Sequence, residues 1–263
     1  MSRIQEKFHQ LKGSGRGGFI PFITAGDPDL ATTDRLLIEL AKAGADFIEL
    51  GVPFSDPVAD GEVIQRASER ALRNGVTVQD ALTCASNVRQ RIDVPLVLFS
   101  YFNPLLQFRP EPFAAVAREA GIDAVLVTDL IPEEAETWTE NLLQHRLDPI
   151  FLVAPTTSDK RLAQIARQAH GFIYAISRAG VTGERDEMTR DAEALVKRIR
   201  SVSDLPIAVG FGISNPEQVR SVWSFADAAV VGSAIVKQIE NLRNSPDLVK
   251  HIGNFARSLV AEA

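Results

Sequence analysis

The chain has 263 residues, of which 45% are hydrophobic and 24% charged, and its formal net charge is −6 at pH 7. This composition is typical of a folded globular domain and excludes disordered, collagen-like and disulfide-scaffold classes. The acidic balance excludes a general nucleic-acid binder, and no apolar run is long enough to span a membrane. The N-terminus lacks the apolar core of a signal peptide, and the single cysteine, Cys84, agrees with a reducing compartment such as the cytoplasm.

The chain alternates between short apolar runs and helical patterns. Residues 1–13 predict an amphipathic helix with Ile4, Phe8 and Leu11 on one face. Strands are predicted at residues 19–24, 47–51, 96–100, 124–128, 150–153, 172–176, 207–210 and 228–231. Helices are predicted around Leu36–Leu40 and at residues 62–74, 78–91, 112–120, 133–144, 160–169, 192–201, 216–223 and 247–261.

Strands that alternate with helices indicate βαβ units and a parallel sheet. Several of the runs, such as residues 124–127 and 228–231, are apolar on both faces, as buried parallel strands are. Eight such units in a chain of this length predict an α/β fold, a single (β/α)8 barrel domain over residues 1–263 with an extra N-terminal helix. The alternative is a doubly wound open sheet, which more often has five or six strands and a glycine fingerprint at its first strand–helix turn.

The segments that follow the predicted strands are richer in polar residues than those that precede them. In a barrel they are the loops at the carboxyl ends of the strands, where active sites are built. Within the second strand, Phe47, Glu49 and Gly51 share one face, so Glu49 points into the barrel near this end. Burial there raises the pKa of a carboxyl group and suits it to general acid–base catalysis. The alternative is a structural carboxylate paired with a cation.

Two further carboxylates, Asp56 and Asp60, lie in the loop that follows this strand. Either one could instead cap the next helix. A second carboxylate about ten residues from Glu49 nevertheless favours a catalytic role for at least one of them, because two carboxyl groups in different environments can divide acid and base roles.

Glycines near the ends of the last strands predict a phosphate site. Gly210 and Gly212 follow the seventh strand, and Gly232 and Ser233 follow the eighth, each just before a helix, which Ser233 itself could cap. Backbone N–H groups at such positions bind phosphate, and these loops are the usual phosphate site of a barrel. Gly183, after the sixth strand, could add a further N–H group. Ordinary turn glycines are the alternative.

Other chemistries are disfavoured. The run at residues 13–18 fits GxGxxG but precedes a strand, so it is the turn into the first strand and not a dinucleotide site. No lysine follows a strand closely enough for a Schiff base, and the four histidines are scattered, so no metal site is expected. Residues 177–186 form a long polar loop that is either a lid or merely flexible. The residues alone predict an acid–base enzyme, without metal or cofactor, that acts on a phosphorylated substrate.

Five motifs resemble those of one known family. GADFIELGVPFSDPVADG, SYFNPLL, SRAGVTG, GFGIS and GSAIV occur in the order in which the α-subunit family of tryptophan synthase has them. The resemblance implies a (β/α)8 barrel and a lyase of tryptophan biosynthesis. Such an enzyme splits indole-3-glycerol phosphate into indole and glyceraldehyde 3-phosphate by a retro-aldol step and has no cofactor of its own.

The resemblance also implies roles for individual residues. Glu49 matches the glutamate that moves the protons, and Asp60 matches the aspartate that takes the indole N–H. Substrate-binding positions match Tyr174, the lid threonine Thr182, and the pocket residues Phe22, Phe99, Leu126, Val153 and Phe211. Phosphate contacts match Gly183, Gly212, Gly232 and Ser233.

The family's partner is a β subunit that carries pyridoxal phosphate and receives indole through a tunnel in an αββα complex. Its contacts match Asp56, Asn103 and Pro104. Many members have proline where this chain has Glu62, and many lack Ile131, which affects docking more than catalysis. A stand-alone lyase, an allosteric activator of a β subunit, and a different phosphate-binding barrel isomerase are the alternatives.

Overall fold

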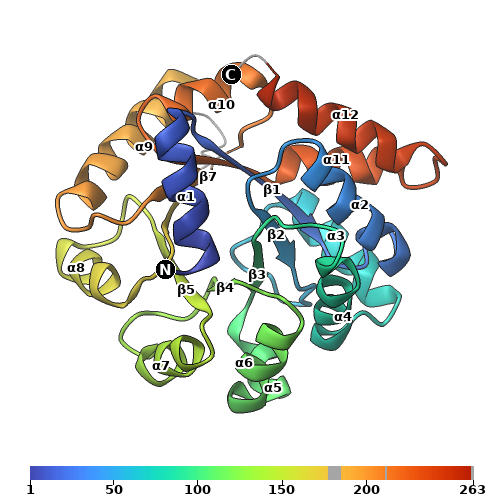
Figure 1. The fold of residues 1–263 in the computed structure, drawn as a ribbon, viewed down its shortest axis with the longest axis horizontal. Coiled ribbons are helices and arrows are strands. Elements are labelled where there is room, and N and C mark those ends of the chain that lie inside the picture. Colours follow the sequence, from blue (N-terminus) through green and yellow to red (C-terminus); the bar gives the residue numbers. More distant parts are fainter. Residues whose placement is uncertain (177–184, 211, 262–263) are drawn as a thin grey trace.

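The computed structural model describes residues 1–176, 185–210 and 212–261. Eight parallel strands form a closed barrel in chain order, and the last pairs with the first (Figure 1). They are β1 (Gly18–Thr24), β2 (Ile48–Gly51), β3 (Leu96–Ser100), β4 (Ala124–Val127), β5 (Asp148–Val153), β6 (Ile173–Ile176), β7 (Ile207–Gly210) and β8 (Ala228–Val231). The predicted (β/α)8 fold is confirmed, and each strand lies within two residues of its predicted bounds.

The helices surround this barrel (Figure 1). They are α1 (Arg3–Ser14), α2 (Leu30–Lys42), α3 (Glu62–Arg73), α4 (Val78–Arg89), α5 (Phe102–Phe108), α6 (Pro110–Glu119), α7 (Glu136–Gln144), α8 (Asp159–Gln168), α9 (Arg185–Arg200), α10 (Pro216–Trp223), α11 (Ser233–Leu242) and α12 (Leu248–Val260). The short helix α5 is not among the predicted ones, because it has only seven residues and contains a proline.

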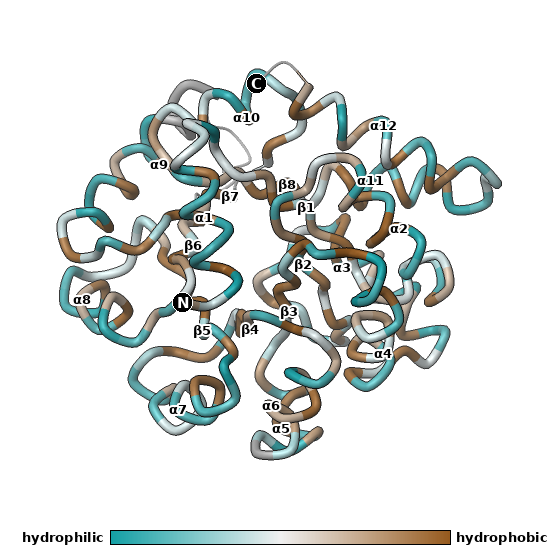
Figure 2. Tube along the Cα trace, in the orientation of Figure 1, coloured by the Kyte–Doolittle hydropathy of each residue, from teal (hydrophilic) through white to brown (hydrophobic). Residues whose placement is uncertain are grey.

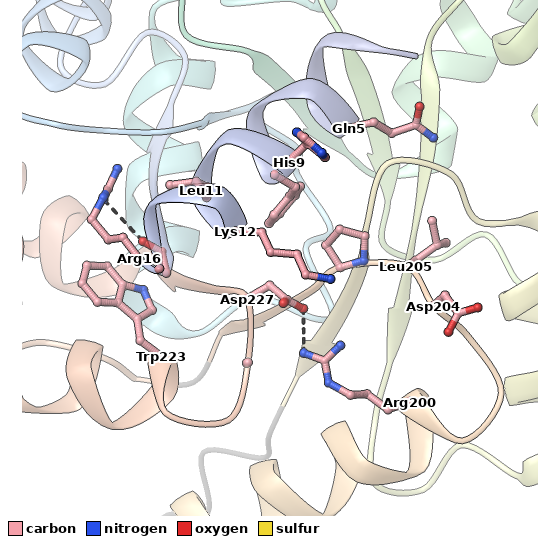
Figure 3. A pocket seen from close by; sticks show the side chains of 15 residues that line it. Gln5, His9, Leu11, Lys12, Arg16, Arg200, Asp204, Leu205, Trp223 and Asp227 are labelled. Atoms are coloured by element: carbon pink, nitrogen blue, oxygen red, sulfur yellow. Dashed lines mark hydrogen bonds and ion pairs between the residues drawn. The ribbon is translucent and has the colours of Figure 1, made fainter.

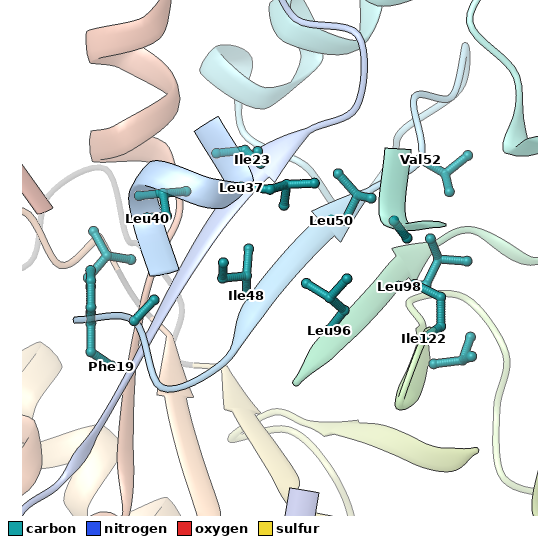
Figure 4. Packing of buried hydrophobic residues seen from close by; sticks show 14 of the residues in the cluster. Phe19, Ile23, Leu37, Leu40, Ile48, Leu50, Val52, Leu96, Leu98 and Ile122 are labelled. Carbon is teal, nitrogen blue, oxygen red and sulfur yellow. The ribbon is translucent and has the colours of Figure 1, made fainter. Parts of the chain in front are cut away.

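The main core lies between the strands and the helices. Figure 2 shows apolar strands inside a ring of helices whose apolar residues alternate with polar ones. Ile48 and Leu50 of β2 pack outward against Leu37 and Leu40 of α2 (Figure 4). Because side chains of a strand alternate, Glu49 faces the barrel interior, as the spacing predicts.

A second cluster fills the barrel interior and is closed at the amino ends of the strands by α1. Ile4, Phe8 and Leu11 of α1 are buried, as predicted. The ring of Phe8 lies 4.6 Å from that of Phe47 and 5.7 Å from that of Phe172, centre to centre. Gly15 ends the helix with φ at 67°, a backbone conformation that favours glycine. Gly13 and Ser14 still belong to α1 and Gly18 begins β1, so the predicted turn into β1 is confined to residues 15–17.

Aspartates join neighbouring strands at this same end of the barrel. Asp46, Asp123 and Asp227 precede β2, β4 and β8 and accept hydrogen bonds from backbone N–H groups of Phe19, Leu96 and Ile207 at 2.9, 3.0 and 2.7 Å. Each carboxylate also pairs with at least one arginine. This end of the barrel is therefore held by structural interactions and leaves the opposite end for the site.

Candidate active site

A cavity of about 210 Å³ opens at the carboxyl ends of the strands. Two carboxylates, two aromatic rings, a tyrosine and the glycines after β7 and β8 meet there. Its lining is Phe22, Glu49, Ala59, Asp60, Gly61, Ile64, Phe99, Thr128, Leu152, Tyr174, Ile176, Gly210, Gly212, Val230, Gly232 and Ser233. Residues from seven of the eight strands and from the loop after β2 therefore converge on one space.

A roomier hollow of about 490 Å³ lies at the other end of the barrel, beside α1 (Figure 3). Its arginines are already engaged with carboxylates. Arg200 binds Asp227 at 2.8 Å, and Arg16 binds Asp46 at 2.6 Å. The hollow lies at the end of the barrel that carries structural interactions, and of its two carboxyl groups Asp227 is already bound to Arg200 and to the N–H group of Ile207. The smaller cavity is therefore the candidate site.

Glu49 is the most deeply buried carboxyl group of this cavity, with 1% of its surface exposed. Its Oε1 atom has no hydrogen-bond partner among the described residues, and no ion pair is formed with a described cation. Burial raises the pKa of Glu49 to about 8. At neutral pH the group is therefore protonated and can donate its proton to a bound molecule. The alternative of a carboxylate paired with a cation is not supported within the described part of the chain.

Asp60 reaches the same cavity from the loop after β2. Burial raises its pKa to about 6, and a hydrogen bond with Tyr101 partly opposes that rise. The residue that caps α3 is Gly61, so Asp60 is not a helix cap. Asp60 is thus ionised at neutral pH while Glu49 is protonated, and the two groups can play different parts in proton transfer.

Tyr101 is a residue of the site that the sequence analysis does not single out. It directly follows β3, and its hydroxyl oxygen accepts a hydrogen bond of 3.0 Å from the N–H of Ala59. Its ring centre lies 5.0 Å from that of Phe54. Tyr101 therefore holds the loop that carries Asp60. Its place at the end of a strand, inside the SYFNPLL motif, is the signal that could have identified it.

Tyr174 projects from β6 into the cavity, which agrees with its predicted place in the site. Burial raises the pKa of its hydroxyl, and the charges of Glu49 and Asp60 raise it further. The phenol therefore stays protonated and remains a hydrogen-bond donor beside both carboxyl groups.

Apolar side chains form the walls. The rings of Phe22 and Phe99 meet edge to face with centres 5.3 Å apart. A Cβ on Gly51 would lie 2.5 Å from the Phe22 ring, so glycine is needed there. Both phenylalanines line the cavity, as predicted. This surface suits a flat, apolar ring system.

Two predicted wall residues lie elsewhere. Val153 packs in the outer core, while its neighbour Leu152 pairs with Tyr174 and lines the cavity. Leu126 faces the barrel interior, but Thr128, the next inward position toward the carboxyl end, occupies the wall instead. Val153 is therefore a correction, because the pairing of Leu152 with Tyr174 places Val153 on the helix side. Leu126 does not line the cavity, although its neighbour Phe99 on β3 does, so its part in the pocket stays a prediction. Phe211 lies outside the described residues.

The predicted phosphate contacts meet at one side of the cavity. Gly212, with φ at 44°, follows β7, and Gly232 precedes α11. Gly232, not Ser233, is the cap residue of α11, and no side chain caps the helix. Free N–H groups at a helix N-terminus attract a phosphate group. Gly183 and Thr182 lie outside the described residues.

The predicted partner contacts lie on the rim of this face and do not line the cavity. Asp56 is exposed in the loop after β2, whereas Asn103 and Pro104 belong to α5, where Asn103 is exposed. Large apolar side chains are also exposed in the segments that follow β2, β3 and β4: Val58 at 87%, Leu106 of α5 at 48% and Ile131 at 38%. Apolar side chains are therefore exposed in three of the segments at the carboxyl end of the barrel.

Within the described ranges, no group of three or more His, Cys, Asp or Glu side chains is arranged to hold a metal ion. None of the helices in the same ranges combines the length and apolar character of a membrane span.

Comparison with known proteins gives a consistent result. A sequence model of the family described as tryptophan synthase alpha chain matches residues 8–261. A tryptophan synthase alpha chain of Citrifermentans bemidjiense is 48% identical over 259 residues, which cover 98% of this chain and 97% of that protein. One of Prochlorococcus marinus is 42% identical and covers 98% and 93%.

Solved structures agree with the sequence relatives. A crystal structure of tryptophan synthase subunit alpha from Legionella pneumophila superimposes with a TM-score of 0.91 at 37% identity and covers 98% of this chain and 97% of that one. A crystal structure of tryptophan synthase from M. tuberculosis, in its aminoacrylate-bound form, gives a TM-score of 0.87 at 35% identity, with 98% and 100% covered.

Proposed function

Because the chain belongs to the tryptophan synthase alpha chain family, we propose that Glu49 and Asp60 carry that family's reaction in it. The chain is a lyase of tryptophan biosynthesis, and it cleaves indole-3-glycerol phosphate into indole and glyceraldehyde 3-phosphate. The observation that carries the proposal is the meeting of two carboxyl groups, with pKa values near 8 and 6, in one apolar cavity.

Glu49 moves the protons. Its protonated carboxyl group donates a proton to C3 of the indole ring, which makes the ring an electron acceptor. The resulting carboxylate takes the proton of the glycerol hydroxyl next to the ring, the carbon–carbon bond breaks, and its electron pair restores the aromatic indole. The step balances in protons, because Glu49 gives one proton to C3 and takes one from the hydroxyl group. A buried group with a pKa near neutrality suits both steps.

Asp60 stabilises the positive charge that this protonation creates. Its carboxylate accepts the hydrogen bond of the indole N–H, and Tyr101 keeps the loop of Asp60 in place. Between their pKa values of about 6 and about 8, Asp60 is ionised while Glu49 is protonated, so both groups have the form that the reaction needs. Tyr174 adds a hydrogen-bond donor beside them.

The substrate is oriented by its two ends. The indole ring lies between Phe22, Phe99 and Leu152, and the phosphate group lies against the N–H groups near Gly212, Gly232 and Ser233. Thr182 and Gly183, with Phe211, stay predictions for the closing loop, the phosphate site and the pocket.

The chain itself carries no cofactor for this reaction. We propose that it docks on a β subunit that holds pyridoxal phosphate, in an αββα complex through which indole is channelled. The support is the exposure of the apolar side chains of Val58, Leu106 and Ile131, and of Asp56 and Asn103, in the segments that follow β2, β3 and β4. A cytoplasmic location belongs to the same proposal and rests on the biosynthetic role and on the buried free thiol of Cys84.

The test is the release of indole from indole-3-glycerol phosphate by the purified chain, alone and with a tryptophan synthase β subunit. Slow release that rises sharply with the β subunit supports the docked assembly. Fast release by the chain alone, unchanged by the β subunit, points to a stand-alone lyase and contradicts the docking proposal. Absence of release in both conditions contradicts the roles of Glu49 and Asp60.

A further inference from the structure

Two helices carry the two ends of the proposed site. Helix α3 begins two residues after Asp60, and α11 begins at Ser233, beside the phosphate contacts. The helices meet behind the aromatic wall, where Ala67 of α3 and Val236 of α11 are fully buried with Phe22. A change in the angle between these helices therefore moves the phosphate site relative to Asp60.

An ion cluster fastens the same two helices to the loop after β1. Arg70 of α3 binds Asp27 through two hydrogen bonds of 2.7 and 2.8 Å, and its remaining nitrogen binds Glu240 of α11 at 3.0 Å. Arg66, one turn earlier in α3, binds Glu240 at 2.7 Å. Lys237 of α11 binds the other oxygen of Glu240, also at 2.7 Å.

The two acids of the cluster are shielded from water. Asp27 is 1% exposed and Glu240 is 9% exposed. Hydrogen bonds from Arg66 and Lys237 hold the pKa of Glu240 well below its usual range. Glu240 is therefore held as a carboxylate, and the paired hydrogen bonds from Arg70 to Asp27 give the cluster a definite orientation.

We propose that the cluster of Asp27, Arg70 and Glu240, with Arg66 and Lys237 at its edge, is a positioning device for the reaction. It sets the N-terminus of α11 against the N-terminus of α3, and so holds the bound phosphate at the distance from Asp60 that the substrate requires. This inference rests on the proposed phosphate site and on the proposed role of Asp60.

Substitution of Glu240 by glutamine separates positioning from charge. Glu240→Gln removes one negative charge from the helix whose N-terminus borders the proposed phosphate site, so an effect of charge alone would tighten the binding of an anion. Loss of positioning weakens it instead. We expect the Kd for glycerol 3-phosphate to rise about tenfold and kcat with indole-3-glycerol phosphate to fall, within the roughly hundredfold loss that a misplacement of about 1 Å can cause.

Glu39→Gln is the matched control. Glu39 of α2 binds Arg257 of α12 at 3.1 Å, so this pair also joins two outer helices but touches neither α3 nor α11. In urea unfolding the control should lose as much stability as Glu240→Gln. Its Kd for glycerol 3-phosphate and its kcat should remain those of the wild type. Arg66→Gln is a milder second variant, because the side chain of Arg66 is 39% exposed, and it should shift both constants in the same direction as Glu240→Gln.

The outcomes distinguish the positioning role of the cluster from the phosphate site itself. Tighter or unchanged binding of glycerol 3-phosphate in folded Glu240→Gln and Arg66→Gln overturns the positioning role. Equal losses in Glu39→Gln overturn it too, because the effect would then be one of general stability. A wild-type chain that binds no glycerol 3-phosphate would instead contradict the phosphate site itself.

Discussion

A Cβ atom on Gly210 of β7 would overlap the hydroxyl oxygen of Tyr174 on the neighbouring strand β6. The absence of a side chain on Gly210 therefore leaves the space that the Tyr174 hydroxyl occupies. Tyr174 in turn lines the same cavity as Glu49 and Asp60.

Replacing this glycine should displace the tyrosine. Gly210→Ala should lower kcat/KM by about tenfold or more and lower the free energy of unfolding by about 1–3 kcal/mol, as overpacking does. Steady-state kinetics and urea unfolding measure the two effects. Gly13→Ala is the control, because a Cβ on Gly13 meets no atom within 4 Å. Full activity in Gly210→Ala would show that the position of the tyrosine is unimportant.

Glu49→Gln should remove cleavage without removing the fold. The amide keeps the size of the carboxyl group but cannot donate and recover a proton, so we expect kcat to fall by about 100- to 10,000-fold. Glycerol 3-phosphate should still bind with wild-type affinity, because the phosphate site is separate. Indole release and a binding titration test this expectation. A variant with wild-type turnover would refute the role of Glu49.

The pH dependence of kcat/KM should be bell-shaped. Activity rises as Asp60 ionises, with its pKa near 6, and falls as Glu49 loses its proton, with its pKa near 8. Asp60→Asn should lower the rate and flatten the acidic limb while the alkaline limb remains. Initial rates of the wild type and of Asp60→Asn, measured between about pH 5 and pH 9, test both expectations. An acidic limb that persists in Asp60→Asn would assign it to another group.

Glu49 should also make folding stability depend on pH. Its pKa is about 8 in the folded chain against an ordinary value of 4.5, so the folded state holds one more proton than the unfolded state between these values. The free energy of unfolding therefore decreases as pH rises through this window. Urea unfolding of Glu49→Gln should show a weaker decrease than the wild type. Parallel slopes in the two proteins would contradict a buried, protonated Glu49.

Docking of the β subunit should depend on the apolar rim. Leu106→Asp should leave the basal cleavage rate unchanged, because Leu106 is exposed on α5 and does not line the cavity. Activation by the β subunit should then require about tenfold more of it, since a charge on an apolar interface is costly. Val202→Asp is the control: Val202 is 43% exposed and follows α9. Equal activation of all three proteins would place the interface elsewhere.

Much of the fold follows from the sequence. Each of the eight strands was recognisable as an apolar run flanked by turn residues, because buried parallel strands need little else. The polar Glu49 within such a run has an unambiguous direction, since its neighbours Ile48 and Leu50 are apolar and must face the helices. Gly210, Gly212 and Gly232 were recognisable for a similar reason, because they lie where a strand ends and the next helix is about to begin.

Other residues of the site could not be predicted from the sequence. The run of β5 is apolar on both faces, so alternation alone cannot tell whether Leu152 or Val153 faces the cavity. The pairing of Leu152 with Tyr174 decides it. Tyr101 is also ambiguous in the sequence, because its role comes from a hydrogen bond to Ala59, 42 residues earlier.

The sequence by itself determined the elements, the end of the barrel that carries the chemistry and the inward direction of Glu49, because these depend on spacing within single elements. Spacing alone left both Asp56 and Asp60 open as the second carboxyl group. Only the tertiary structure decided which uncharged residues line the cavity and which charged side chains bind one another. Arg70 lies 43 residues from Asp27 and 170 from Glu240 in the chain, yet it binds both. Such contacts depend on how closed strands and packed helices bring distant segments together, and no local pattern contains that information.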